Sequence, residues 1–159
     1  MARSALPTSV LCCYTEMRQE TLDSLLTYAP DFDMVNVSGD DYGYWKAINS
    51  HWNGTNDLVI IEHDIEIDVR VMPSFKICDR DWCLFSYNAW SNSDADADYE
   101  RALGCTKFSA HMQRLVPAEL FYGRYGQLDT FIVQVFGEIG ITEPHIHGKV
   151  KHHHRYPGT

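Results

Sequence analysis

The chain has 159 residues, of which 45% are hydrophobic, enough for one domain with a core and too few for two. Its formal net charge is −9, with 13 Lys and Arg against 22 Asp and Glu, which argues against a protein whose main task is to grip a nucleic-acid backbone. No apolar run approaches the ~18 residues of a membrane helix, and the N-terminus carries no signal-peptide pattern. We therefore expect one soluble domain over residues 1–159, in the cytoplasm, with its cysteines as free thiols.

The first 64 residues alternate between short apolar runs and amphipathic stretches, which predicts strands alternating with helices. The predicted elements are a strand over 9–14, a helix over 18–29, a strand over 33–37, a helix that ends at Asn53-Gly54, and a strand over 57–61. This alternation indicates parallel pairing. The predicted fold class is therefore α/β, a Rossmann-like fold with a mostly parallel central sheet flanked by helices.

The second half of the chain is less regular. Its predicted elements are strands over 81–87 and 102–106, a short helix over 109–115, an amphipathic helix that begins near Leu128, and an extended tail over 144–156. We expect the tail to return to the edge of the sheet. Cys78 and Cys83 are spaced C-x4-C, which is loose for zinc ligands, and no second pair follows. The sequence therefore does not favour a zinc site made of cysteines.

Glu62-His63-Asp64 directly follows the third predicted strand. In an open α/β sheet, ligands bind outside the carboxyl ends of the strands. Two acidic residues separated by one residue can both turn toward one divalent ion, and oxygen ligands suit Mn²⁺ or Mg²⁺. Glu62 and Asp64 are therefore the predicted metal ligands. The alternative interpretation is a strand end that becomes polar where it meets solvent.

The order strand–helix–strand–helix–strand–E-x-D resembles the nucleotide-sugar glycosyltransferases of the GT-A fold. In that family a Rossmann-like first half ends in a D-x-D or E-x-D motif that holds the metal of a nucleoside-diphosphate sugar. The resemblance covers residues 8–67, the expected nucleotide-binding half. It is fainter over 68–159, the expected acceptor half and tail.

The resemblance also implies contacts to the nucleotide sugar from several positions. Tyr14 and Thr15 follow the first strand, where family members contact the base, and Asp40 lies in a turn that resembles an acidic base-binding turn. The stretch Gly43–Asn49 resembles a family segment that precedes the metal motif. The implied donor-binding residues are Tyr14, Thr15, Asp40, Trp45, Asn49, His63 and Lys151. The alternatives are an aromatic strand end for Tyr14, a turn-forming role for Asp40 and a core position for Trp45.

The tail contains His145, His147, His152, His153 and His154. Its segment from His145 to Lys151 resembles the H-x-x-G-x-x-K segment of one GT-A branch. That resemblance implies His145 as the third metal ligand and Lys151 as a contact to the diphosphate, where an ammonium neutralises the leaving group. His147 is the competing ligand, because residues i and i+2 of a strand share a face. The alternative is a solvated basic tail.

Asp129 begins the amphipathic helix of the second half. In inverting GT-A enzymes a carboxylate on a helix in this half takes the proton of the acceptor hydroxyl, so the resemblance implies that Asp129 is the catalytic base. The family usually has an acidic pair there, whereas this chain has Leu128-Asp129. The alternative is a capping role, since Asp favours the first helical turn.

The resemblance to the GT-A family implies a metal-dependent, inverting glycosyltransferase that uses Mn²⁺ or Mg²⁺ and a nucleoside-diphosphate sugar, with a UDP-sugar as the expected donor. A glycan and a hydroxymethylated DNA base are both candidate acceptors, and the residues do not distinguish among sugar, lipid, protein and nucleobase hydroxyls. The chain is short for a GT-A enzyme, which leads us to expect a partner or a homodimer. Two alternatives stay open: a non-catalytic nucleotide- or metal-binding domain, and a metal-dependent phosphotransfer or hydrolytic enzyme that uses the same acidic pair.

Overall fold

The structure, a computed structural model, describes residues 7–88, 98–99, 101–141 and 143–153. The strands are β1 (Thr8–Tyr14), β2 (Phe32–Asn36), β3 (Asp57–Ile61), β4 (Ile65–Glu66), β5 (Trp82–Asn88), β6 (Asp98–Tyr99), β7 (Cys105–Phe108), β8 (His145–Lys149) and β9 (Lys151–His152). The helices are α1 (Gln19–Tyr28), α2 (Gly43–His51), α3 (Val71–Ile77), α4 (Ala110–Leu115) and α5 (Leu128–Glu138), with the short 3-10 helices η1 (Ala118–Phe121) and η2 (Tyr125–Gln127).

The main sheet has the strand order β2-β1-β3-β7-β5, with β6 and β8 also paired to β5. β1 pairs in parallel with β2 and β3, and β8 pairs in parallel with β5. β7 is antiparallel to both β3 and β5, so β2, β1, β3, β5 and β8 all run in the same direction. The predicted α/β, Rossmann-like fold with a mostly parallel sheet flanked by helices is confirmed.

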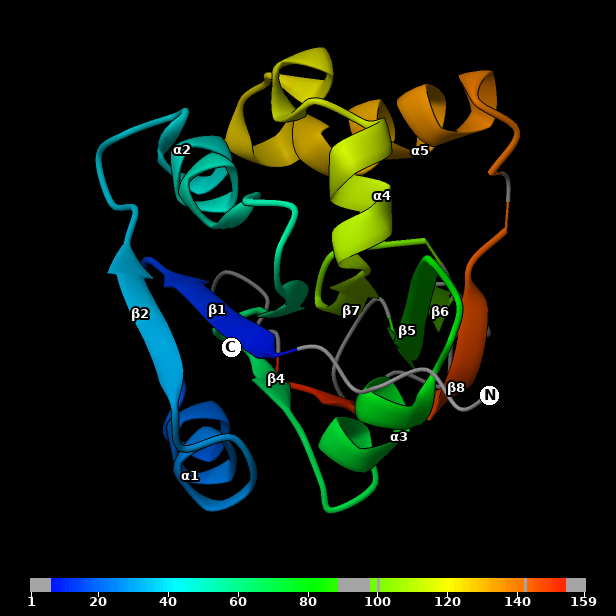
Figure 1. The fold of residues 1–159 in the computed structure, drawn as a ribbon. Coiled ribbons are helices and arrows are strands. Elements are labelled where there is room, and N and C mark those ends of the chain that lie inside the picture. Colours follow the sequence, from blue (N-terminus) through cyan, green and yellow to red (C-terminus); the bar gives the residue numbers. More distant parts are fainter. Residues whose placement is uncertain (1–6, 89–97, 100, 142, 154–159) are drawn as a thin grey trace.

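Helices cover both faces of this sheet (Figure 1). Alternate residues of the central strands enter two separate core clusters, as expected of strands buried on both faces. In β1, Leu11 and Cys13 join the cluster under α2, α4 and α5, whereas Val10 and Cys12 join the cluster over α1 and α3. The continuous apolar runs of the first half are therefore the inner layer of a three-layer structure.

The predicted elements of the first half are found within about two residues of their expected bounds. In the second half, the strand predicted over 102–106 begins only at Cys105, and its antiparallel direction was not anticipated. Ser109 precedes α4 and caps it, because its hydroxyl accepts a hydrogen bond from the backbone N–H of Met112. α3 and the two-residue strands β4 and β6 were not predicted.

The tail returns to the sheet, as predicted. β8 pairs with β5, and β9 then pairs antiparallel with β4, so that His152 lies opposite Ile65 and Lys151 opposite Glu66. This second pairing brings residues 151–153 to the segment that follows Glu62-His63-Asp64. His154 and the rest of the predicted tail lie outside the described residues.

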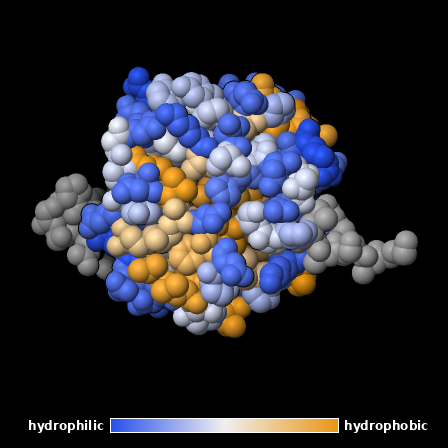
Figure 2. Space-filling view, turned by 60° about the vertical axis from the view of Figure 1, so that its left-hand side comes forward, coloured by the Kyte–Doolittle hydropathy of each residue, from blue (hydrophilic) through white to orange (hydrophobic). Residues whose placement is uncertain are grey.

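Figure 2 shows the side of the molecule at the left of Figure 1, where apolar residues gather among hydrophilic ones. β2 is the edge strand of the main sheet, and its Met34 is 48% exposed.

No helix of the described residues is long and apolar enough to span a bilayer. All five cysteines are free thiols, as expected.

Candidate active site

The carboxyl ends of the parallel strands meet at one edge of the sheet. Tyr14 ends β1 and Asn88 ends β5, while Glu62-His63-Asp64 directly follows β3. Because β7 is antiparallel, its amino end reaches the same edge, where the carbonyl of Gly104 accepts a hydrogen bond from the backbone N–H of Glu62 at 2.9 Å. The topology therefore brings polar groups from four strands to one place.

Glu62 is the centre of this group. The hydroxyl of Tyr44, in the first turn of α2, donates a hydrogen bond to Glu62 Oε1 at 3.1 Å. Burial, the charge of Asp129 and the charge of Asp64 raise the pKa of Glu62 to about 8, although the Tyr44 contact acts in the opposite direction. At neutral pH the carboxyl group therefore holds a proton that a nearby cation would displace.

Asp64 is only 8% exposed and contacts the tail twice. Its Oδ2 atom lies 3.0 Å from Nε2 of His152, and its carbonyl accepts the backbone N–H of His153 at 2.7 Å. Burial opposes ionisation of Asp64, but the hydrogen bond and charge of His152 and the charge of His63 outweigh it, so the pKa of Asp64 lies below its ordinary value. Asp64 is therefore the ionised member of the motif.

His152 bridges two strands of this edge. Its Nδ1 atom lies 2.7 Å from the carbonyl oxygen of Asn88, and its Nε2 atom faces Asp64. Both ring nitrogens thus lie within hydrogen-bond distance of an oxygen atom. His152 therefore connects the end of β5 to the acidic motif after β3.

His63 joins the motif to β1. Its Nδ1 atom accepts a hydrogen bond from the backbone N–H of Thr15 at 3.0 Å. Burial lowers the pKa of His63, so the neutral ring is favoured with its proton on Nε2. The structure therefore gives His63 a positioning role between the two strand ends, in addition to its predicted place beside the ligand.

Asp129 lies in the first turn of α5, but it does not cap that helix. Its Oδ1 atom accepts a hydrogen bond from the backbone N–H of Leu103 at 2.9 Å, in a different segment. The residue is exposed, yet protein atoms around its carboxyl group raise the pKa of Asp129, against the effect of the Leu103 contact. Because its charge also raises the pKa of Glu62, Asp129 belongs to the same carboxylate group.

Two of the remaining predicted ligand contacts are exposed at this edge. Thr15 lies exposed after β1, and Asp40 lies exposed in the turn after β2. Asp40 forms an ion pair with Lys46 at 2.9 Å and accepts the backbone N–H of Tyr42, and both contacts lower the pKa of Asp40. Asp40 is therefore fixed as an anion at the position predicted for a base contact.

Trp45 and Asn49 both lie on α2. The indole N–H of Trp45 donates to the carbonyl of Ala118 at 2.9 Å, and its ring packs edge-on against Tyr122, contacts that agree with the core interpretation. Asn49 lies exposed toward the end of α2, five residues after Tyr44. At 1.5 Å per residue, this places it roughly 7.5 Å along the helix axis from the turn that reaches Glu62.

The prediction that His145 completes the site of Glu62 and Asp64 is wrong. His145 pairs with Cys83, near the start of β5, whereas His152 contacts Asn88 at its end. Five strand residues separate these positions, about 16 Å at 3.3 Å per residue. His147, the competing ligand, also lies on β8 away from the acidic motif. The histidine that reaches Asp64 is His152.

Lys151 lies near the site in the chain but points to its neighbour Glu66, with Nζ 3.5 Å from Oε2. It is exposed and lines a cleft of about 820 Å³ beside His152. Other basic groups of this cleft are Arg18, Arg70 and Lys149. Lys151 therefore belongs to a basic cleft next to the acidic motif rather than to the carboxylate group itself.

Sequence reasoning missed the tyrosines that surround Glu62. Tyr44, Tyr87 and Tyr125 all have raised pKa values, caused first by burial and next by the charge of Glu62. The packing is close: a Cβ atom on Gly104 would lie 2.3 Å from the hydroxyl of Tyr87. The signal in the sequence was Gly104, since a glycine permits such an approach of the backbone.

The fold and this edge define an α/β protein with a carboxylate group at the carboxyl ends of its parallel strands. No family model and no curated protein matches the chain. Among solved structures, the crystal structure of A197 from STIV is similar, with a TM-score of 0.53 and 13% sequence identity. The match covers 79% of this chain and 77% of A197. At this identity the likeness shows the fold alone.

Proposed function

We propose that this protein is a metal-dependent glycosyltransferase that moves a sugar from a nucleoside-diphosphate sugar to an acceptor hydroxyl. The observation that carries the proposal is the grouping of Glu62, Asp64 and Asp129 at the carboxyl ends of the parallel strands. Open α/β sheets bind their ligands at this edge. The position of Glu62-His63-Asp64 directly after β3 agrees with the resemblance to the GT-A fold.

The donor atoms of this group suit a divalent cation. Carboxylate oxygens are the ligands that Mn²⁺ and Mg²⁺ prefer, and Glu62 and Asp64 supply them. The contacts from Tyr44 and His152 orient the two carboxylates, and because a carboxylate oxygen accepts more than one bond, they do not exclude a metal ligand. When bound, such an ion would neutralise the charge that builds on the leaving diphosphate.

Asp129 is the proposed base of an inverting transfer. A raised pKa brings a carboxylate closer to the value at which it accepts a proton efficiently. Its hydrogen bond from Leu103 fixes the carboxylate through Oδ1, and Oδ2 is the atom proposed to face the acceptor hydroxyl. We propose that Asp129 takes that proton as the hydroxyl oxygen attacks the anomeric carbon.

The nucleotide is proposed to lie across the ends of β1 and β2, near Tyr14, Thr15 and Asp40, with a UDP-sugar as the expected donor. The acceptor is proposed to be a glycan or a hydroxymethylated DNA base, reached by the protein alone or as a homodimer. The free thiols agree with a cytoplasmic location.

A thermal-shift screen of UDP-, GDP-, CDP- and TDP-sugars with and without Mn²⁺ tests the proposal, followed by detection of the released nucleoside diphosphate and the transferred sugar. Asp64→Asn should remove both the metal-dependent shift and turnover. Asp68→Asn is the matched control, because Asp68 is a nearby acid that pairs with Arg70 instead. Binding without turnover would favour the non-catalytic domain, release of phosphate without sugar transfer would favour the hydrolytic enzyme, and no nucleotide binding would overturn the proposal.

A further inference from the structure

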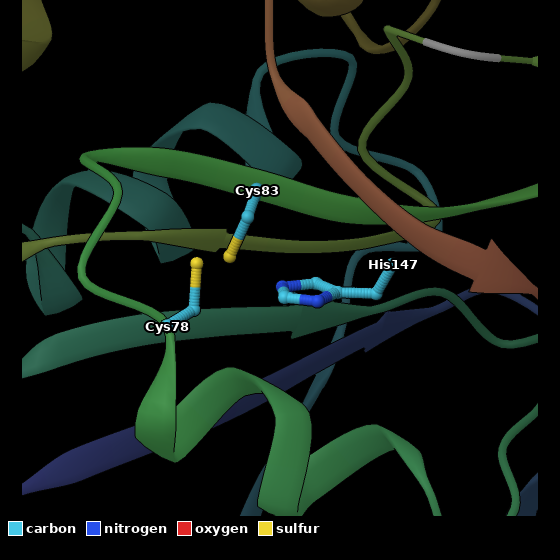
Figure 3. A group of neighbouring side chains, drawn as sticks. All are labelled: Cys78, Cys83 and His147. Carbon is cyan, nitrogen blue, oxygen red and sulfur yellow. The ribbon is translucent and has the colours of Figure 1, made fainter.

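Three side chains with metal-ligating atoms meet away from the carboxylate group. Cys78 follows α3, Cys83 lies in β5 and His147 lies in β8 (Figure 3). Their ligand atoms all lie within 4.8 Å of one another. The three residues come from three separate elements, so the fold and not local sequence brings them together.

Two aromatic rings hold the ring of His147 in place, but its Nε2 atom makes no hydrogen bond to any described residue. The ring stacks on Phe85 at 5.5 Å and meets Phe75 edge-on at 5.9 Å. Its Nε2 atom is buried and has no hydrogen-bond partner among the described residues. Burying such a group without a partner costs free energy, so its persistence calls for an occupant. Figure 3 shows the ring directed toward the two sulfur atoms.

The charged side chains beside the two thiols are Lys107 and Asp57. Lys107 is 1% exposed, lies opposite Cys83 in the sheet, and donates hydrogen bonds to the carbonyls of Phe75 and Cys78. The carboxylate of Asp57 lies 3.8 Å from its ammonium group. Two thiolates and Asp57 would supply three negative charges, and Lys107 with a divalent ion would supply three positive ones. With both thiols protonated, Lys107 and Asp57 balance each other, and when the thiols ionise a divalent ion balances their two added charges.

We propose that Cys78, Cys83 and His147 hold a zinc ion, with water in the fourth tetrahedral position. Two thiolates and a neutral imidazole are the ligand set that zinc prefers over Mg²⁺ or Mn²⁺. A disulfide between the two cysteines would leave the buried nitrogen of His147 unexplained.

The zinc ion would fasten the tail to the body of the protein. Its ligands connect the end of α3 and the start of β5 to β8, and the chain continues from β8 into β9, where His152 contacts Asp64. This role does not depend on the proposed glycosyltransferase activity, because it needs neither a nucleotide nor the carboxylate group.

Titration of the reduced, metal-free full chain with Co²⁺ tests the proposal. In wild-type protein the thiolate-to-cobalt charge-transfer absorption and the visible bands of a tetrahedral ion should correspond to one thiolate-bound ion per chain, and Zn²⁺ should abolish them. Cys78→Ala, at a half-buried position, and His147→Asn should each abolish tight binding or shift these bands, with the circular-dichroism spectrum unchanged. Cys105→Ala, a buried cysteine outside the group, is the control and should bind like wild type.

Two results would overturn the zinc site. The first is wild-type protein without thiolate-to-cobalt absorption. The second is an unchanged spectrum in both Cys78→Ala and His147→Asn. Should either variant fail to fold, the other still decides, since the two residues lie in different elements.

Discussion

Replacing Glu62 by Gln should stabilise the metal-free protein, although most substitutions at hydrogen-bonded sites destabilise. The amide of Gln keeps an oxygen that accepts the hydrogen bond from Tyr44. Gln cannot ionise in either state, so it removes the cost of keeping Glu62 protonated in the folded protein while the unfolded chain would ionise. The substitution therefore separates the cost of the charge from the packing of the side chain.

The magnitude follows from the pKa of Glu62, which burial and the two neighbouring carboxylates raise from 4.5 to about 8. Below pH 4.5 the group is neutral in both the folded and the unfolded chain and costs nothing. As the pH rises toward 8, the unfolded chain releases a proton that the folded protein retains, so the folded state loses stability. At about 1.36 kcal/mol per pKa unit, the loss at pH 7 is roughly 3 kcal/mol, and the partial solvent exposure of Glu62 reduces it to about 2 kcal/mol.

Urea unfolding in EDTA, from about pH 5 to about pH 9, measures this effect. The wild-type free energy of unfolding should fall relative to that of Glu62→Gln across the range, with a difference of about 2 kcal/mol at pH 7. Excess Mn²⁺ should stabilise the wild type and leave the Gln variant unchanged. Tyr44→Phe is a control that should enlarge the wild-type loss, because the Tyr44 contact favours the charged form. Parallel curves for the wild type and Glu62→Gln would refute the reasoning.

Three further substitutions test the rest of the site. Asp129→Asn keeps an acceptor for the N–H of Leu103 but cannot take a proton. We therefore expect kcat to fall on the order of 10²-fold or more while donor affinity and Tm stay unchanged. A fully active variant would show that Asp129 is not the base. His152→Leu removes a hydrogen bond to a buried carboxylate and should cost about 1–3 kcal/mol in urea unfolding, with weaker Mn²⁺ binding. His145→Ala, at an exposed position, should leave Mn²⁺ binding unchanged, and a large loss there would restore the original assignment.

The first half of the fold was predictable because burial on both faces leaves a continuous apolar signature. β3 was placed residue for residue, since the four residues after Asp57 are all apolar and alternate between two cores. α3 was missed because it has only seven residues and contains Pro73, so its periodicity is too brief to recognise. β4 and β9 have two residues each and exist only through their pairing with one another.

The acidic motif was also predictable in place, since a residue that follows a parallel strand must lie at the carboxyl edge. Its partners were not, because they come from distant positions: Tyr44 before it, Asp129 and His152 far after it. No local pattern distinguishes a tyrosine that faces Glu62 from one that faces the core. The zinc ligands show the same limit, since the C-x4-C spacing lacks the third ligand that β8 supplies.

The prediction and the structure differ most in the tail, where His152 and not His145 reaches the acidic motif. The reason is the register in which β8 pairs with β5. A strand that joins the edge of a sheet can pair at several offsets, and only side-chain burial selects one. β8 alternates weakly, with no residue fully buried, so its sequence does not specify the offset. The pairing of His145 with Cys83 fixes the positions of the later histidines. His147 then packs against Phe75 and Phe85 beside the two thiols. His152 then reaches Asp64. His152 follows His145 by seven positions. The register of β8 on β5 therefore places His145 at the end of the sheet that holds Cys78 and Cys83, and His152 at the end that holds Glu62 and Asp64. The two ends thereby acquire ligand sets of opposite softness, which is the property that would let one chain keep zinc and manganese apart.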